Sequence, residues 1–538
     1  MDYDLITEDE FDALRDDDSM SASYIKYPGK RSPLRPSYSF LPSQLSSSTS
    51  TAGLTQGKQT AKLHARKVAR ELGVDDGLIY LPGLPEILLE DSDQPRLFRQ
   101  RRYFFYITGA NFEDCAATYE IKHDKLTLWI PYVEPRDVLW FGSKPSAVEC
   151  KRRYHVDEVR YTTQLSKFLR KFAAQPSPPI VYILHPDQAP DLGCESLSRL
   201  SLDDSCLLPA MDRARVVKSD YEVAMVRRAN DISSAAHRSV AERILRLTNE
   251  REIEAIIQAV CIANGSRSQA YPIIAGSGPN ASTLHYGSND APLKGKQCVV
   301  IDAGCEWNCY ASDITRTLPL SGSWSPRAAA IHAIVQRMQE ECIAEVAPGK
   351  LWRDIHLHAA SVGMEGLLKL GILKGSREDV ARAGTVAAFF PHGLGHHVGL
   401  EVHDVSGTLA LGAATAHGVQ LGFGKRAVVT PSMLADMIRL ASSPDDMGVQ
   451  ESKGQHLQPN MIVTVEPGIY FCREYLEATF RGDPTHAQFI DWDLLEEYYD
   501  VGGVRIEDCL LVTEHGYQNL TVAPKGDELL DVINKGKK

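Results

Sequence analysis

Short apolar runs between residues 60 and 209 predict strands mixed with helices. The strand-like runs are LIYLPG at 78–83, YFFYITG at 103–109, KLTLWIPY at 125–132 and IVYILHP at 180–186. An amphipathic pattern over Val156–Phe172 predicts a helix among these strands. Because strands and helices alternate, we predict an α/β N-terminal domain over residues 59–209.

The chain beyond residue 210 begins with clear helix signals. Ser219 with Glu222 forms a capping-box pattern, Ser325-Pro326 places a cap and a first-turn proline, and Thr248 precedes a third apolar helical pattern. Strand-like runs follow these helices, namely CVVIDAG at 298–304, YASDITRTLPL at 310–320, MIVTVEPGIYF at 461–471 and GGVRIEDCLLV at 502–512. We therefore place a second domain at residues 210–530.

Two segments depart from this globular pattern. Nine of the first 18 residues are acidic, and residues 43–51 read SQLSSSTST, so residues 1–58 are predicted to form a disordered acidic and Ser-rich tail. The connection at about 406–455 is longer than a simple loop and is treated as an insertion. Within it, TPSMLADMIRLASS at 430–443 predicts a short amphipathic helix.

Composition narrows the possible partners. The 538 residues carry 58 basic and 70 acidic side chains, a formal charge of −12 that argues against nucleic-acid binding and a polybasic membrane surface. The 11 cysteines are an odd number, and neither a signal-peptide pattern nor a run of about 18 apolar residues is present. These features predict a reduced, soluble protein of the cytoplasm with no membrane partner.

Four acidic residues stand in or beside strand-like runs, where burial is expected. They are Asp302, Asp313, Glu466 and Glu507. An unpaired buried ion costs several kcal/mol even after relaxation, so something must compensate these carboxylates. Asp302 and Asp313 flank a polar turn, as in a hairpin that aims both at one face. Two divalent cations would balance four carboxylates, which favours a dinuclear metal centre.

A histidine-rich loop, PHGLGHHVGLEVHD at 391–404, lies between these acidic residues along the chain. It contains His392, His396, His397 and His403, and its glycines allow the backbone to approach a site closely. Oxygen donors with one imidazole favour harder ions such as manganese or magnesium over thiolate-preferring zinc, with manganese as the first choice, although cobalt, iron or zinc could occupy the site.

Seven fragments in order, HYG, DAG, SDITR, HGLGH, VHD, TVEPGIY and GGVRIED, resemble the pita-bread family of proline-specific metallopeptidases. This family comprises the Xaa-Pro aminopeptidases, whose fungal type is the best match, and the prolidases. The resemblance covers about residues 215–525, and LFRQRRYFFYITG at 97–109 resembles the start of the family's non-catalytic N-terminal domain. It implies an α+β pita-bread (creatinase/aminopeptidase-like) catalytic domain over 210–530 and a homodimer.

The resemblance also implies five metal ligands. They are Asp302, Asp313, His396, Glu466 and Glu507. Asp313 and Glu507 are expected to bridge two divalent ions, for which Mn²⁺ is the expected metal. Asp302 is expected to bind one ion, and His396 with Glu466 the other.

Further residues are implied in catalysis by their positions in the family motifs. His285, His392 and His403 are expected to line the substrate site and stabilise the tetrahedral intermediate. Arg505 and Tyr470 match an arginine and a tyrosine beside the ligands. A structural role is the alternative for His285, and Arg505 could instead neutralise Asp508 or a neighbouring acid.

The implied reaction is hydrolysis of the N-terminal Xaa-Pro bond by a hydroxide that bridges the metals, with Glu466 as proton carrier. Peptides with proline at position two are the expected substrates. One alternative is a prolidase, because both groups share the five ligands and differ in the length of substrate. A second alternative is an inactive pita-bread scaffold that acts as a binding module.

Overall fold

The computed structural model describes residues 53–175, 179–191, 200–405, 428–442 and 455–535. Most of the predicted tail and most of the predicted insertion therefore lie outside the described residues. Residues 53–58, which we assigned to the tail, belong to the first described helix, α2 (Gly53–Leu72). Among the described helices, none combines the length and apolar composition needed to cross a membrane.

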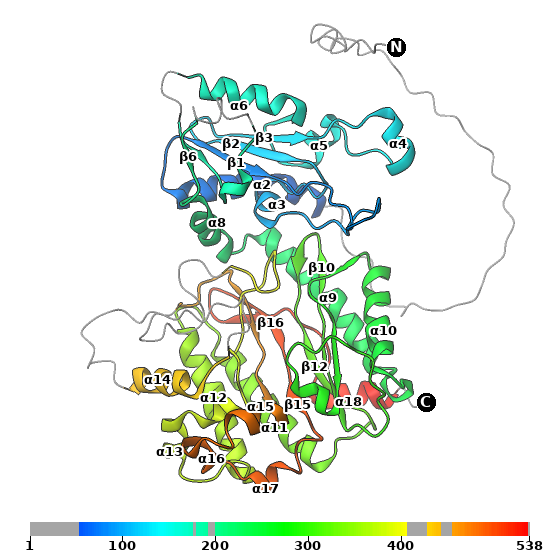
Figure 1. Ribbon diagram of the computed structural model, residues 1–538, viewed down its shortest axis with the longest axis vertical. Helices are drawn as coiled ribbons and strands as arrows, with labels where there is room; N and C mark the ends of the chain where they lie inside the picture. The colour runs from blue at the N-terminus through cyan, green and yellow to red at the C-terminus, as the bar shows by residue number, and fades with distance from the viewer. Residues whose placement is uncertain (1–52, 176–178, 192–199, 406–427, 443–454, 536–538) are drawn as a thin grey trace, which may run out of the picture. The chain divides into compact units, whose positions relative to one another are not determined.

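The N-terminal part contains a six-stranded mixed sheet in the order β4-β3-β2-β1-β5-β6 (Figure 1). Its strands are β1 (Leu78–Pro82), β2 (Ala116–Glu120), β3 (Lys125–Ile130), β4 (Glu158–Tyr161), β5 (Val181–Tyr182) and β6 (Leu202–Asp203). The accompanying helices are α3 (Arg102–Thr108), α4 (Pro135–Phe141), α5 (Ala147–Arg153), α6 (Leu165–Ala173) and α8 (Leu207–Val216). The predicted strands at 78–83 and 125–132 are thus confirmed.

Two predictions for this part are wrong. The run YFFYITG forms helix α3, because a continuous apolar run fits a buried helix as well as a strand. Gly109 ends this helix in the left-handed conformation (φ 72°), and its N–H donates to the carbonyl of Phe105. The helix predicted over Val156–Phe172 is divided, since its first part is β4, which pairs in parallel with β3, and α6 begins at Leu165.

The helices of the second part are set by their caps. Ser219 and Glu222 form the predicted capping box, and Ser325 accepts a hydrogen bond from the N–H of Ala328, as predicted. Helix α10 is capped by Asn249 and not by Thr248, because the Asn249 side chain accepts from the N–H of Arg251. These long helices are α9 (Asp220–Ala241), α10 (Glu250–Ala263), α11 (Pro326–Glu345) and α12 (Trp352–Leu370).

Shorter helices complete this part. They are α13 (Arg377–Ala383), α14 (Pro431–Ser442), α15 (Arg473–Thr479), α16 (Pro484–Ala487), α17 (Trp492–Leu495) and α18 (Gly526–Lys535). Helix α14 confirms the amphipathic helix predicted within the insertion.

The strands of the second part form small sheets that meet at the predicted acidic residues. They are β7 (Ser268–Gln269), β8 (Ile274–Ser277), β9 (Cys298–Asp302), β10 (Cys305–Trp307), β11 (Tyr310–Ala311), β12 (Thr315–Pro319), β13 (Ile462–Val465), β14 (Gly468–Tyr470), β15 (Gly503–Arg505), β16 (Asp508–Val512) and β17 (Tyr517–Asn519). Strand β9 pairs with β12, so that Asp302 stands opposite Thr315, and a bridge from Thr315 to Glu507 joins this sheet to the segment before β16.

A buried charge cluster lies behind the histidine-rich loop. Asp404 accepts hydrogen bonds from Arg215 at 2.5 Å and from Lys218 at 3.0 Å, and all three side chains are at least 98% buried. Burial opposes the Asp404 charge, but Lys218 and Arg215 hold the pKa of this carboxyl below its usual range. The fold therefore depends on an ionised Asp404.

We expect Asp404→Asn to destabilise the protein by about 3–5 kcal/mol, because it leaves two buried cations without a counter-charge. The urea midpoint followed by tryptophan fluorescence measures this loss. Glu341→Gln, which removes an exposed partner of Arg337, is the control and should cost less than about 1 kcal/mol.

The difference in stability between wild type and Asp404→Asn should depend on pH. The folded pKa of Asp404 is lowered, so its stabilisation is complete above the unfolded value of about 3.9 and is lost as the pH falls through the folded pKa. The gap between wild type and Asp404→Asn should stay constant from about pH 5 to 8 and shrink below about pH 4. A gap that widens on acidification would contradict this assignment.

Candidate metal centre

The five predicted ligands stand on segments that are distant along the chain. Asp302 ends β9, Asp313 precedes β12, Glu466 follows β13 directly, and Glu507 lies between β15 and β16. His396 is on the histidine-rich loop, and its N–H donates to the hydroxyl of Thr464 in β13 at 3.0 Å. Tertiary pairing of short strands therefore sets the positions of all five.

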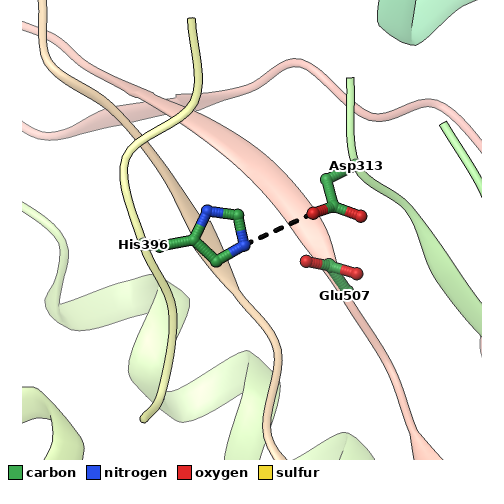
Figure 2. Close-up of side chains that lie close together, drawn as sticks. All are labelled: Asp313, His396 and Glu507. Atoms are coloured by element: carbon green, nitrogen blue, oxygen red, sulfur yellow. Dashed lines mark ion pairs between the residues drawn. The ribbon is translucent and has the colours of Figure 1, made fainter. Parts of the chain in front are cut away.

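Three of these side chains converge most tightly. Asp313, His396 and Glu507 are buried, and each offers a ligand atom within 4.8 Å of the others (Figure 2). His396 Nε2 lies 3.3 Å from an Asp313 oxygen and 3.2 Å from an oxygen of Glu466. Four of the five predicted ligands thus form one cluster.

Asp302 is linked to this cluster through Tyr271. The phenol of Tyr271 donates to Asp302 at 2.7 Å and also contacts Asp313. Burial, followed by the charges of the two carboxylates, raises the pKa of this phenol well above its usual range. Tyr271 is not among the residues predicted from the sequence, because a tyrosine ahead of an apolar strand has no distinctive spacing and acts here only through its position in the folded chain.

The cluster carries an excess of negative charge, and this charge shifts the pKa values of its members. Burial, together with Asp313, Glu466 and Asp302, raises the pKa of Glu507 well above its usual range. Burial also raises the pKa of Asp313, to about 6, despite the opposing effect of His396. Burial opposes a charged imidazole, but Asp313 and Glu466 still raise the pKa of His396 to about 10.

One oxygen of Glu507 indicates that the cluster fits a cation. Glu507 Oε2 accepts a hydrogen bond from Thr315 at 2.7 Å, whereas Glu507 Oε1 is buried and has no hydrogen-bond partner among the described residues. An unsatisfied buried carboxylate oxygen is costly, and coordination to a cation would satisfy it. The oxygen-rich set with one imidazole therefore fits divalent metal ions.

Arg505 connects the cluster to further predicted site residues. Its guanidinium donates to Asp302 at 2.6 Å and to the hydroxyl of Tyr470 at 2.9 Å. The same hydroxyl lies 2.9 Å from His392 Nε2. Arg505, Tyr470 and His392 thus form one continuous chain of hydrogen bonds that begins at Asp302.

The alternative that Arg505 neutralises Asp508 is contradicted. Asp508 pairs with Arg316 at 2.7 Å and with Lys525 at 2.9 Å. Arg505 instead faces Asp302, one of the predicted ligands.

The remaining histidines differ in their surroundings. The rings of His403 and His396 meet edge to face, 4.3 Å between centroids, and the His396 charge, followed by burial, lowers the pKa of His403 to about 4. His285 is exposed on the loop after β8. Burial lowers the pKa of His392. His397 bonds Gln455 at 2.7 Å.

Comparisons with known proteins agree with this geometry. Residues 224–514 match the family model described as Metallopeptidase family M24, and residues 61–182 match Aminopeptidase P, N-terminal domain. A "Probable Xaa-Pro aminopeptidase" of Metarhizium acridum is 80% identical over 543 residues, 100% of both chains. Another, from Colletotrichum graminicola, is 59% identical over 483 residues, 88% of this chain and 91% of that one.

Two solved structures of aminopeptidase P are also similar to this chain over most of its length. Zn-substituted aminopeptidase P of E. coli in complex with product has a TM-score of 0.71 at 25% identity, and the match covers 89% of this chain and 100% of that one. The E. coli enzyme with the inhibitor Pro-Leu has the same TM-score and identity, covering 89% and 99%. The predicted fold class, an α/β N-terminal domain followed by a pita-bread catalytic domain, is confirmed. The chain therefore belongs to metallopeptidase family M24.

Proposed function

We propose that this protein is a Xaa-Pro aminopeptidase, which hydrolyses the bond between the first residue of a peptide and a proline at position two. The observation that carries the proposal is the buried carboxylate–imidazole cluster, in which Glu507 retains an oxygen suited to a cation. The names of the similar fungal proteins and the E. coli structures support the same activity.

We further propose that five residues hold two divalent ions. They are Asp302, Asp313, His396, Glu466 and Glu507. Asp313 and Glu507 are the proposed bridging ligands, and the proximity of both to His396 supports this assignment. The oxygen-rich donor set supports manganese as the native metal. Bound divalent ions would supply Lewis-acid activation of the scissile carbonyl and of a water molecule.

The protein's own groups would handle protons and charge. Glu466 is a partly exposed carboxylate beside His396 and can pass a proton from the attacking water to the leaving proline nitrogen. His403 stands edge to face with His396, 4.3 Å between ring centroids, and a ring N–H of His403 can donate to the oxyanion of the tetrahedral intermediate. Arg505 holds Asp302 in place, and Tyr470 orients His392.

Proline itself explains the need for a dedicated site. The Xaa-Pro bond is a tertiary amide without an N–H, so a protease cannot recognise it by strand-like pairing of the backbone. A shaped site that positions the reacting groups replaces that recognition. We place His285 and His392 along this substrate site.

We also propose that the protein is located in the cytoplasm and forms a homodimer. The ten cysteines within the described residues are free thiols, which supports a reducing compartment, the cytoplasm.

On helix α4 the residues Leu139, Trp140 and Phe141 are 77–83% exposed, which supports burial of these apolar groups against a second copy of the chain in a homodimer.

Replacing Asp313 with Asn should lower both metal content and kcat/KM by about 100-fold or more, because the neutral amide cannot bridge two cations. Elemental analysis of the purified variant, with hydrolysis assayed after manganese reconstitution, measures both quantities. Full activity in Asp313→Asn would refute the bridging assignment.

Two adjacent histidines provide a matched comparison. His396→Asn should lose metal and activity, whereas His397→Asn, at a buried histidine that bonds Gln455, should retain its metal. Equal metal loss in the two variants would contradict the choice of His396.

Substrate length separates the aminopeptidase from a prolidase. We expect higher kcat/KM for a Xaa-Pro-Xaa tripeptide than for the Xaa-Pro dipeptide, measured by release of the first amino acid. Clear preference for the dipeptide would establish the prolidase alternative. A metal-free, inactive protein would instead support the binding scaffold.

The proposed homodimer is tested at α4. Trp140→Asp places a charge in an exposed apolar group and should shift sedimentation velocity from dimer toward monomer. Asp137→Asn changes the charge on the same helix and should leave the dimer intact. A monomeric wild-type protein at micromolar concentration would contradict the dimer.

A further inference from the structure

Glu250 is a fully buried carboxylate (0% exposed) outside the proposed metal cluster, at the first residue of α10. Its Oε1 accepts from the N–H of Ser277 at 2.8 Å, the hydroxyl of Ser277 at 2.6 Å and the amide of Asn280 at 3.2 Å. Its Oε2 accepts from the hydroxyl of Tyr286 and the N–H of Ala291, both at 2.9 Å. Five neutral donors thus surround one negative charge.

All five donors belong to the single segment 277–291, and His285 lies within it. Ser277 and Asn280 precede His285, whereas Tyr286 and Ala291 follow it. The N–H of Glu250 also donates to the carbonyl of Ala291 at 3.1 Å. Glu250 therefore closes the base of the loop that carries His285, although the His285 side chain itself is exposed.

A carboxylate is required for this arrangement. Both Glu250 oxygens accept hydrogen bonds, as the two oxygens of a carboxylate can. In a glutamine one of these oxygens is replaced by an NH₂ group, which is itself a donor and would face the donors of segment 277–291 without an acceptor. Burial of the charge is costly, but the five hydrogen bonds and the N-terminal end of α10 offset that cost. The loop conformation thus depends on the two acceptor oxygens of one side chain.

Segment 277–291 is also in close contact with the strand that carries Arg505. A Cβ on Gly502 would lie 1.8 Å from the carbonyl oxygen of Gly278, and one on Gly503 would lie 2.5 Å from that of Ala281. Two consecutive glycines therefore let the 278–282 turn lie directly against the start of β15. Glu250 consequently sets the loop of His285 relative to the Arg505 strand.

We propose that Glu250 is a positioning residue for His285 and affects turnover through it. This inference rests on the proposed Xaa-Pro aminopeptidase activity and on the placement of His285 in the substrate site. A displacement of about 1 Å in a reacting group can reduce the rate about 100-fold, so a loop held by five hydrogen bonds has a kinetic consequence.

The test is a double-mutant cycle with Glu250→Gln and His285→Asn, assayed on a Xaa-Pro-Xaa tripeptide with the manganese-loaded enzyme. Glu250→Gln should lower kcat by about tenfold or more with metal content unchanged. In the His285→Asn background the same change should cost less than about threefold, because the group it positions is gone. Full additivity, or wild-type kcat in Glu250→Gln, would overturn the inference.

Glu222→Gln is the matched control. Glu222 is equally buried in the first turn of α9 and accepts from Ser219, but it lies outside segment 277–291. Any loss of kcat in Glu222→Gln should be the same in both His285 backgrounds. A loss that also disappears in the His285→Asn background would mean that the cycle reports general instability, and would count against the inference.

Tyr286→Phe serves if Glu250→Gln does not fold. It removes one hydrogen bond to Glu250 and should lower kcat about threefold or more, again with little effect in the His285→Asn background. Unchanged kcat in Tyr286→Phe would then overturn the inference. Failure of wild-type, metal-loaded protein to hydrolyse any Xaa-Pro peptide would refute the proposed function instead.

Discussion

The site depends on the close packing of four carboxylates where short strands meet; three of them are buried and Glu466 is partly buried. Asp302, Asp313, Glu466 and Glu507 come from separate segments, and close approach of like charges away from water costs several kcal/mol for each ion. His396 and Arg505 supply positive charge, yet Glu507 keeps a raised pKa and an unsatisfied oxygen. The centre is therefore built for additional cationic charge, as membership of a metallopeptidase family implies.

Thr315 joins the sheets that bring these groups together. It stands opposite Asp302 in the β9–β12 pair, and its carbonyl accepts from the N–H of Glu507 at 3.1 Å. Its hydroxyl donates to Glu507 at 2.7 Å and accepts from Arg505 at 3.3 Å. One fully buried side chain thus aligns carboxylates from both sheets with the arginine that faces Asp302.

The loops around the centre are held by buried carboxylates of two kinds. Asp404 holds the end of the histidine-rich loop through two cations, whereas Glu250 holds the His285 loop through five neutral donors. Both carboxylates hold a loop on a buried internal anchor, which suits groups that must be positioned toward a substrate. The ion pair contributes chiefly to stability, and the hydrogen-bonded carboxylate contributes to placement.

Local patterns along the chain were enough to predict several capped helices, some strands and the family. The capping box at Ser219, the cap at Ser325 and strand β9 follow from local preferences and periodicity, and the ordered acidic and histidine motifs indicated the family. The three-dimensional fold was needed to find that YFFYITG is helical, that Tyr271 contacts Asp302, and that Glu250 closes the His285 loop. The physical reason is that burial and long-range hydrogen bonds are properties of neighbours in space, which local patterns do not contain.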